Sequence, residues 1–371
     1  MRLVHVVGAR PNFMKIAPVL RALDARGGFE QLLVHTGQHY DPQMSEVFFQ
    51  QLQLPRPDVY LGVGSGSHAQ TTARVMLALE PVFAEKEPAL VVVAGDVNST
   101  LAAALVAAKN VPPIPIAHVE AGLRSFDWTM PEEVNRVVVD RLSALCLTPS
   151  ADGDENLLKE GVVPERIARV GNVMIDSLRQ ALPVSEQLAP ALLGRLGLAR
   201  RGYALVTLHR PANVDDPAVL SKLVEALGTV AAKLPVLFPV HPRTRKRLGE
   251  GDAGRRMAAA QGLVLIDPAG YFEFQALMAN AKVVLTDSGG IQEETTAMGV
   301  PCLTLRENTE RPVTITEGTN TLVGRDPARI VPELERILAG ESKAGRLPAL
   351  WDGHAAERVA DAIVRLLGRA S

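Results

Sequence analysis

The chain of 371 residues is 47% apolar and 22% charged, so it suits two soluble, globular domains of ordinary size. A formal net charge of −2 and an aromatic content of 4% argue against nucleic acid or an anionic membrane surface as a partner. The two cysteines, Cys146 and Cys302, lie in apolar runs and are expected to be small core residues rather than a disulfide or a metal pair.

In the first half of the chain, short apolar runs that predict strands alternate with longer amphipathic runs that predict helices. We expect strands at residues 3–8, 31–36, 89–94 and 114–119, and helices that include residues 13–25 and 69–84. The alternation predicts a parallel, doubly wound sheet. The first strand starts almost at residue 1, and no apolar run approaches the roughly 20 residues that span a bilayer. We therefore expect no signal peptide, no membrane helix and a cytoplasmic location.

Polar side chains follow four successive predicted strands. They are Arg10, Gln38, Asp96 and Glu120. A lone charged residue is usually solvated surface, but four polar groups at four strand ends are hard to explain in that way. Ligands of doubly wound sheets bind at the carboxyl ends of the strands, so we predict a site there. Lys15 adds a second cation near Arg10 and makes that corner a plausible phosphate site.

Two adjacent acids, Glu132 and Glu133, fall in the first turn of a helix that Pro131 is expected to begin. Simple compensation of the helix dipole explains one of them. The other acid then remains available for chemistry.

A second α/β pattern follows residues 183–201, which are rich in Pro, Leu and Ala and which we interpret as a connector. Strands are expected at residues 203–208, 235–240, 262–266, 283–286 and 302–305. We therefore expect two Rossmann-like domains, residues 1–182 and 183–353. A closing helix at residues 354–371 is expected to pack back on the first domain.

The strand at residues 283–286 is followed by Asp287, Ser288 and the glycine pair Gly289-Gly290, and then by a helix. Glycine allows the backbone to approach a ligand closely. The first amides of the helix have no internal partner, and the helix dipole adds positive charge. This turn predicts an anion site, most often for phosphate. An ordinary strand-to-helix turn capped by Ser288 explains the glycine pair equally well.

Together these groups suit a nucleotide-sugar in a cleft between two such domains. The cations that would hold a pyrophosphate are Arg10, Lys15, Arg136, Arg210 and Arg311. The carboxylates that would oppose it are Asp96, Glu120 and Glu132. General acid–base chemistry explains why acids stand beside a diphosphate, because crowded carboxylates raise one another's pKa. Metal binding is the alternative role, but no motif with recognised metal-ligand spacing supports it.

The motifs resemble, in order and over most of the chain, those of the non-hydrolysing UDP-N-acetylglucosamine 2-epimerases. They are GARP (residues 8–11) with Lys15, GD (95–96), HVEAGLR (118–124), PEEVNR (131–136), HR (209–210), DSGGIQEE (287–294) and ERP (310–312). The resemblance implies an α/β fold of two Rossmann-like domains in the glycosyltransferase B arrangement, and a homodimer. It also implies a cytoplasmic enzyme of cell-envelope polysaccharide synthesis, with a UDP-sugar as substrate and with neither NAD nor a metal as cofactor.

The implied reaction interconverts UDP-GlcNAc and UDP-ManNAc. The sugar C2 proton is removed as UDP leaves, which gives 2-acetamidoglucal, and UDP is then added back with protonation on the other face. By motif position the catalytic residues are Asp96, Glu120, Glu132, His209 and Lys15. The substrate-binding residues are Arg10, Arg136, His241, Phe274, Ser288, Gly289, Gly290, Glu294 and Arg311. Which acid removes the proton does not follow from the sequence.

The chain departs from many relatives at three places. Residues 8–12 read GARPN where the relatives read GTRPE. At residues 211–213, after His209-Arg210, the chain has Pro-Ala-Asn where they show Arg-Glu-Asn. Residues 38–43 lack the charged side chains that we expect where some bacterial members bind a second UDP-GlcNAc, which argues against allosteric activation.

Other functions remain open on the same scaffold. A glycosyltransferase with a UDP-sugar donor is one, although it does not explain three acids and Lys15 in the first domain. A hydrolysing epimerase, a non-catalytic nucleotide-sugar sensor and an epimerase of a differently decorated 2-acetamido UDP-sugar are the others.

Overall fold

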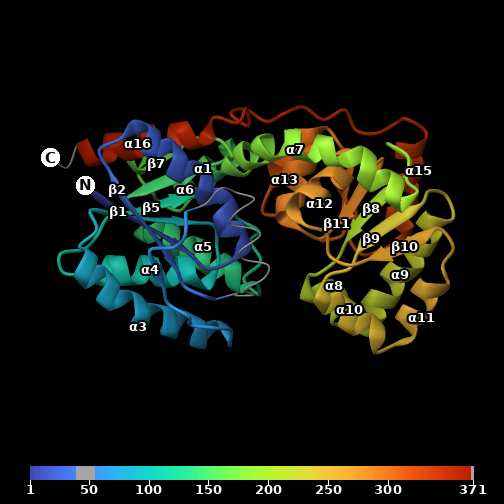
Figure 1. Ribbon diagram of the computed structural model, residues 1–371, viewed down its shortest axis with the longest axis horizontal. Coiled ribbons are helices and arrows are strands. Elements are labelled where there is room, and N and C mark those ends of the chain that lie inside the picture. Colours follow the sequence, from blue (N-terminus) through green and yellow to red (C-terminus); the bar gives the residue numbers. More distant parts are fainter. Residues whose placement is uncertain (39–54, 369–371) are drawn as a thin grey trace. The chain divides into compact units, whose positions relative to one another are not determined.

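The computed structural model of the protein describes residues 1–38 and 55–368 (Figure 1). The chain divides into two compact units: unit 1 is Met1–Ser177 with Ala349–Ser371, and unit 2 is Leu178–Pro348. Each unit is a parallel sheet with helices, so the predicted α/β class is confirmed. No helix in the described part of the chain is long and apolar enough to cross a membrane.

The sheet of unit 1 has seven parallel strands in the order β3-β2-β1-β4-β5-β6-β7. Their bounds are β1 (Arg2–Val7), β2 (Glu30–His35), β3 (Val59–Tyr60), β4 (Leu90–Ala94), β5 (Ile116–Val119), β6 (Leu145–Thr148) and β7 (Ile167–Arg169). All residues of β4, β5 and β6 are buried, because helices cover both faces of a parallel sheet and strands of this kind are apolar on both sides.

Helices cover the two faces of this sheet (Figure 1). They are α1 (Arg10–Arg26), α3 (His68–Lys86), α4 (Asn98–Lys109), α5 (Pro131–Leu142), α6 (Ala151–Lys159) and α16 (Ala355–Gly368), with a short 3₁₀ turn η1 (Pro164–Arg166). On one face, α3, α4 and α5 share a core with the strands, and on the other α16 packs against α1. Asp176 accepts hydrogen bonds from the amides of Ala355 and Ala356 at the start of α16.

The sheet of unit 2 has six parallel strands in the order β10-β9-β8-β11-β12-β13. Their bounds are β8 (Ala204–Thr207), β9 (Val236–Pro239), β10 (Leu263–Ile266), β11 (Val283–Thr286), β12 (Cys302–Thr304) and β13 (Asn320–Leu322). Each strand lies within the run that the sequence predicts for it, apart from β13, which was not predicted. At three residues, β13 is too short to give a period-2 pattern.

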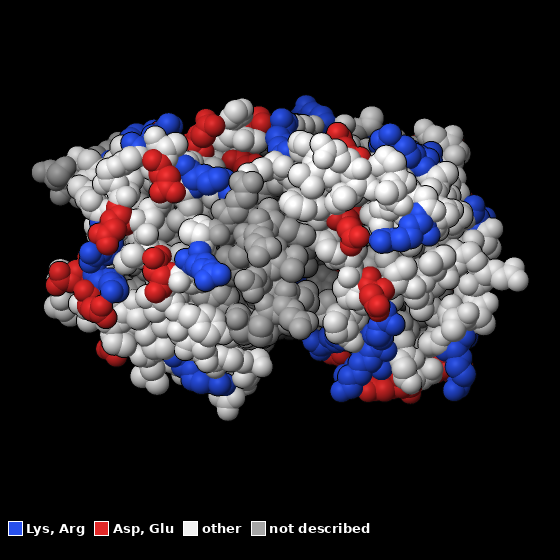
Figure 2. All heavy atoms as spheres, in the orientation of Figure 1, with Lys and Arg blue, Asp and Glu red and all other residues white. Residues whose placement is uncertain are grey.

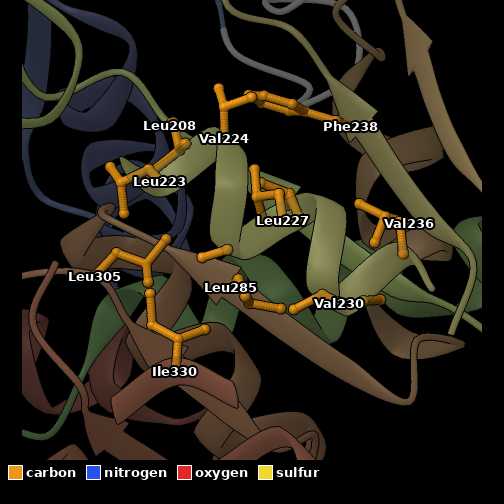
Figure 3. Packing of buried hydrophobic residues seen from close by; sticks show 14 of the residues in the cluster. Leu208, Leu223, Val224, Leu227, Val230, Val236, Phe238, Leu285, Leu305 and Ile330 are labelled. Carbon is orange, nitrogen blue, oxygen red and sulfur yellow. The ribbon is translucent and has the colours of Figure 1, made fainter. Parts of the chain in front are cut away.

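The core of unit 2 is built mainly between one helix and the sheet (Figure 3). The helices are α8 (Pro211–Val214), α9 (Pro217–Ala231), α10 (Pro242–Gly249), α11 (Asp252–Ala259), α12 (Tyr271–Ala279), α13 (Gly289–Met298), α14 (Pro312–Thr316) and α15 (Pro327–Leu338). Leu223, Leu227 and Val230 recur on one face of α9 at intervals of three or four residues and pack against Phe238 and Leu285 of the strands.

The predicted connector at residues 183–201 is wrong for most of its length. A single helix, α7 (Val173–Leu196), runs through Pro183 and Pro190. Each proline removes one helical hydrogen bond, but the residues around them are mostly Leu, Ala and Gln, which favour helix. Leu192 and Leu193 of the last turns are also buried in a core of unit 2, so packing outweighs the breaker signal.

Acidic and basic side chains are interspersed over the face drawn in Figure 2, which agrees with the net charge of −2. The two cysteines are buried and free, as predicted, and burial raises the pKa of the Cys302 thiol to about 11.

Candidate active site

The strand order of unit 1 brings the predicted polar positions together at one edge of its sheet. The strands β2, β1, β4 and β5 are consecutive neighbours, and all run parallel. Their carboxyl ends lead into the loops that carry Gln38, Gly8, Asp96 and Glu120, in that spatial order. Adjacent ends of parallel strands form the usual ligand edge of such a sheet.

The Gly8 corner is closed by Asn12, the residue at which this chain departs from many relatives. Asn12 Oδ1 accepts hydrogen bonds from the amides of Gly8 and Ala9, and its Nδ2 donates to the Ala94 carbonyl at 2.7 Å. A glutamate could accept but could not donate, so asparagine ties the start of α1 to the end of β4. The side chain of Arg10, the first residue of α1, lies outside the description.

At the end of β2, Gln38 Oε1 accepts hydrogen bonds from the amide (3.0 Å) and the hydroxyl (2.7 Å) of Ser99. Gln38 is therefore tied to the start of α4. The remainder of the segment that bears on allosteric activation, residues 39–43, lies outside the described residues.

Lys15 and Glu120 form a buried ion pair. Their side chains are 6% and 5% exposed. Gly95 makes room for the pair, because a Cβ at this position would lie 2.8 Å from Nζ of Lys15. Glu120 has a φ of +71°, a left-handed conformation that is costly for a residue with a side chain and that is found mostly at functional sites.

Asp96 lies in the loop that follows β4. Its Oδ2 accepts hydrogen bonds from Arg136, 2.9 Å from Nε and 2.7 Å from Nη2, and its carbonyl oxygen accepts one from Asn135 at 2.8 Å. Arg136 also pairs with Glu133. The predicted phosphate cation Arg136 is thus 3% exposed and placed between two carboxylates rather than open to solvent.

The two adjacent acids of α5 have different environments. Glu133 is buried, pairs with Arg136 and accepts hydrogen bonds from the amides of Ser125 and Phe126. Glu132 is half-buried and has no hydrogen-bond or ion-pair partner among the residues that the structure describes. Consecutive helical residues point about 100° apart, which explains why one acid serves the structure and the other remains available.

In unit 2, the glycine turn after β11 lacks the serine cap. Ser288 occupies the N-cap position of α13, but its side chain makes no capping hydrogen bond, and its amide donates to Thr286 Oγ1 at 3.0 Å. Ser288 thus occupies the cap position that the alternative of an ordinary turn expects, but its hydroxyl does not cap the helix. The first amides of α13, beginning at Gly289, have no intrahelical acceptor, as in any helix.

Asp287, just before this turn, organises the loop that follows β8. The carboxylate is fully buried and accepts hydrogen bonds from the amides of His209 and Arg210 and from Nδ2 of Asn213. His209 Nδ1 lies 2.9 Å from Asp287 Oδ1. Burial acts to raise the pKa of Asp287, but the hydrogen bond and charge of His209 outweigh it and hold that pKa below its ordinary value. The Nε2 atom of His209 is left for a ligand.

The ring of His241 lies beside that of His209, with 5.7 Å between the ring centroids. Partial burial, together with the charge of His209, lowers the pKa of His241. Its Nδ1 accepts a hydrogen bond from the Arg243 amide at 3.2 Å, so the proton of the neutral ring sits on Nε2.

A cluster of arginines and glutamates lies beside the glycine turn. Arg311 binds both Glu293 (2.8 Å from Nε) and Glu310. Arg306 lies 2.8 Å and Arg210 4.0 Å from Glu310. A Cβ at Gly289 would lie 2.7 Å from Glu310 Oε1 and would also overlap Arg311, so glycine is needed where the turn approaches this cluster. The cluster thus contains three arginines and two glutamates.

The remaining predicted residues come from α12 and α13. Glu294 is buried, and its Oε1 accepts a hydrogen bond from Gln275 Nε2 at 2.8 Å. Phe274, the residue before Gln275, is half-buried and packs against the core cluster that includes Leu277 and Val284. Gly290 is the second residue of α13.

Several residues of the site networks were not in the predicted site, among them Asp287, Arg306 and the buried pair of His118 and Asp140. Asp140 could have been found from helical spacing, because Glu133, Arg136 and Asp140 follow one another at i, i+3 and i+7 on one face of α5. Asp287 lies at a strand end, as the predicted acids do. Arg306 lies in a loop, where neither the helical nor the strand periodicity predicts the direction of a side chain.

Unit 1 offers carboxylates that could exchange protons: Glu120 beside Lys15, Asp96 beside Arg136, and Glu132 in the first turn of α5, which has no partner among the described residues. The arrangement of unit 2 can hold an anion beside an oriented imidazole. Within residues 1–38 and 55–368, no group of three or more His, Cys, Asp or Glu side chains is placed to hold a metal ion.

Comparison with known proteins gives matches over nearly the whole chain. A family model described as UDP-N-acetylglucosamine 2-epimerase matches residues 21–364. The UDP-N-acetylglucosamine 2-epimerase of Methanocaldococcus jannaschii is 39% identical over 371 residues, which cover 99% of each chain. The UDP-2,3-diacetamido-2,3-dideoxy-D-glucuronate 2-epimerase of Pseudomonas aeruginosa is 40% identical over 370 residues, 99% of this chain and 100% of the relative.

Solved structures agree. The M. jannaschii UDP-GlcNAc 2-epimerase in complex with UDP-GlcNAc and UDP matches with a TM-score of 0.89 over 100% of both chains, at 39% identity. A lipopolysaccharide outer core galactosyltransferase matches with a TM-score of 0.58 at 14% identity, a likeness that shows the fold alone.

Proposed function

This chain belongs to the UDP-N-acetylglucosamine 2-epimerase family, and on that premise we propose that it interconverts UDP-GlcNAc and UDP-ManNAc by elimination and re-addition of UDP. The observation that carries the proposal is the set of three carboxylates in unit 1. Inversion of a carbon that exchanges its proton needs groups on both faces of the sugar. A single acid would serve a transferase but not this reaction.

In the proposed reaction, a carboxylate among Asp96, Glu120 and Glu132 takes the C2 proton. The C–H electron pair forms the C1–C2 double bond, and the C1–O bond breaks with its electrons on the UDP oxygen. In the reverse sense, the UDP oxygen attacks C1, and C2 accepts a proton from an acid on the opposite face. UDP leaves as an anion, so no redox cofactor takes part in the balance.

We assign the acid–base role to unit 1 and UDP binding to unit 2. The Lys15–Glu120 pair supports the first assignment, because the buried ion pair fixes this acid at the carboxyl ends of the unit 1 strands, where ligands of such sheets bind. The first amides of α13 at Gly289 and Gly290, which have no intrahelical acceptor, support the second, with Ser288 at the same turn and Arg311 nearby. His209 would meet the leaving diphosphate through Nε2, while Glu294 would bind ribose hydroxyls and His241 and Phe274 would face uridine.

A second candidate substrate is a differently decorated 2-acetamido UDP-sugar. It is favoured by the P. aeruginosa relative, whose identity to this chain equals that of the M. jannaschii enzyme within one percentage point. The C2 chemistry is the same for both sugars. Only groups that contact C3 and C6 of the sugar would differ.

Proton NMR in deuterated water tests the proposal, with each UDP-sugar supplied separately and with no NAD or metal added. Deuterium at C2 together with UDP-ManNAc signals is the expected result with UDP-GlcNAc. Exchange only with the 2,3-diacetamido glucuronate sugar would select the second candidate. UDP binding without exchange from either sugar would favour a transferase or a sensor and overturn the epimerase. Free ManNAc in place of UDP-ManNAc would indicate a hydrolysing enzyme.

We also propose that the enzyme acts as a homodimer in the cytoplasm and supplies a sugar for cell-envelope polysaccharide. The family likeness supports each of these statements. Light scattering after size exclusion tests the first, and cell fractionation tests the second. The fate of labelled product in cells tests the third.

A further inference from the structure

One buried side chain lies between the two loops that carry Asp96 and Glu120. His118, in β5, is 0% exposed. Its Nε2 is 2.8 Å from the carbonyl oxygen of Gly95, and its Nδ1 is 2.6 Å from Oδ1 of Asp140. Both atoms that face the ring are acceptors. The ring therefore bridges the Gly95 carbonyl and the Asp140 carboxylate.

Asp140 carries the connection on to the Glu120 loop. Its Oδ2 accepts a hydrogen bond from the Gly122 amide at 3.1 Å and lies 2.8 Å from Nη1 of Arg124. Burial acts to raise the pKa of Asp140, but the charges and hydrogen bonds of His118 and Arg124 outweigh it and hold that pKa below its ordinary value. The carboxylate thus stays charged and keeps both contacts.

The Glu120 loop needs such support, because the left-handed backbone conformation of Glu120 is costly for a residue with a side chain. Glu120 has a φ of +71° and Gly122 a φ of +81°. A Cβ at Gly122 would lie 2.8 Å from Cα of Gly153, so the loop is also pressed against α6. A strained loop relaxes unless the surrounding contacts fix it.

The Asp96 loop is held by the same helix. Asn135 and Arg136 of α5 bind the carbonyl and the carboxylate of Asp96. Asp140, one turn further along α5, reaches the Glu120 loop directly and the Gly95 carbonyl through His118. One helix face therefore sets the position of both acids.

We infer that His118 and Asp140 are positioning residues, which fix the Glu120 loop relative to the Asp96 loop without touching the substrate. The inference rests on the proposed function, since it assigns these two acids to one reaction. Displacement of a catalytic group by about 1 Å costs about 10²-fold in rate. The loss should fall on kcat, because UDP binding is assigned to unit 2.

The test compares His118→Gln and Asp140→Asn with His5→Gln, a matched control. His5 is also a histidine of the unit 1 sheet with 0% exposure, but it lies in β1, away from both loops. We expect kcat to fall about 10²-fold in both test variants, with KM and UDP affinity within about twofold of wild type. His5→Gln should lower the unfolding temperature and keep the kcat of wild type. The double variant should be no slower than the slower single one, because the two residues act as one unit.

A folded His118→Gln or Asp140→Asn variant with kcat within about twofold of wild type would overturn the inference, as would an equal loss of kcat in His5→Gln. Asp140→Asn keeps the size of the side chain and serves where His118→Gln lowers the yield of folded protein. Absence of C2 proton exchange in the wild-type protein would overturn the proposed function instead. Proton NMR of the wild-type sample in deuterated water reveals this outcome.

Discussion

In unit 1 the cations Lys15 and Arg136 pair with carboxylates of one sheet edge, whereas in unit 2 three arginines beside the glycine turn share the carboxylates of Glu293 and Glu310. Lys15 faces Glu120, and Arg136 lies between Asp96 and Glu133. Both sheets are parallel and doubly wound, so the difference does not come from architecture. It comes from the residues placed at equivalent strand ends.

The histidine–aspartate pairs of the two units differ in the same way. In unit 1 both His118 and Asp140 are buried, and the ring faces only protein. In unit 2 Asp287 is buried, but the side chain of His209 is 36% exposed. The first pair can only support its surroundings, whereas the second can present a ring nitrogen to a ligand. This difference agrees with the proposed assignment of proton chemistry to unit 1 and of anion binding to unit 2.

The largest expected effect tests the acid–base assignment in unit 1. Glu132→Gln should lower kcat about 10³-fold, because a general acid or base contributes about 10²–10⁴-fold. Stability and UDP affinity should stay unchanged, since no described residue pairs with Glu132. The contrasting variant is Glu133→Gln, which should destabilise the fold by about 3–5 kcal/mol because it leaves the buried Arg136 without one partner. Steady-state kinetics, thermal unfolding and calorimetry with UDP measure the three quantities. A fully active Glu132→Gln would contradict the assignment.

A second prediction makes unit 1 the acid-sensitive half. Burial lowers the pKa of His5 from 6.5 to about 4, against the opposing effect of a contact with Gln31. Above pH 6.5 the ring is neutral in both the folded and the unfolded chain. Between pH 6.5 and 4 only the unfolded chain takes up the proton on this ring, so His5 contributes a fall in stability of about 3 kcal/mol over this window. Burial also lowers the pKa of His35 to about 4, which adds a fall of the same sign. His5→Leu should remove the fall that His5 contributes.

Denaturation at several pH values, followed by tryptophan fluorescence, measures the pH dependence of the stability of unit 1. Both tryptophans, Trp128 and Trp351, belong to this unit. The exposed His354 supplies the control variant His354→Leu, which should keep the pH dependence of wild type. An equal pH dependence in His5→Leu and wild type would show that other groups control acid stability.

A third prediction concerns the close approach in unit 2. Gly289→Ala should destabilise the protein by about 1–3 kcal/mol and weaken UDP binding, because its Cβ meets Glu310 and Arg311. Gly228→Ala, in the middle of α9 with open space around it, should instead stabilise by about 0.5–1 kcal/mol. Unfolding temperatures of the two variants are expected to shift in opposite directions. Shifts of the unfolding temperature in the same direction would mean that the turn rearranges to accommodate the added Cβ at residue 289.

The smallest expected effect tests the arginine cluster beside the glycine turn of unit 2. Arg210→Ala should weaken UDP binding about tenfold, as for the loss of one charge-assisted hydrogen bond, and leave stability nearly unchanged. Its side chain is 27% exposed, and its ion pair with Glu310 is long, at 4.0 Å. The exposed Arg336, paired with Glu333 on α15, gives the control Arg336→Ala. Equal UDP affinity in both variants would remove Arg210 from the anion site.

The sequence predicts the strand ends well, because a parallel strand buried on both faces is a continuous apolar run that stops at a polar residue. Asp96 and Glu120 follow such runs directly. The course of α7 was not predictable in the same way, since Pro183 and Pro190 signal a break that packing overrides. Propensity is local, whereas the burial of Leu192 and Leu193 depends on residues far along the chain.

The charge partners were also beyond the sequence. Glu132 and Glu133 are adjacent and identical in kind, and only the direction in which α5 faces the sheet decides which of them meets Arg136. The pairing of His118 with Asp140 joins a strand to a helix across 22 residues. Spacing places each residue on a face of its own element, but it does not say which two faces meet.

Unit 1 is made from both ends of the chain, and this has a consequence for how the protein emerges from the ribosome. Residues 178–348 of unit 2 are synthesised before α16, whose buried face includes Val359, Ile363 and Leu367. The sequence order therefore lets unit 2 complete its core first. Until α16 is synthesised, the surface of α1 that packs against it stays exposed. Early termination within the last turns of α16 would leave a folded unit 2 attached to an incompletely folded unit 1. Chaperones and proteases would recognise such a chain.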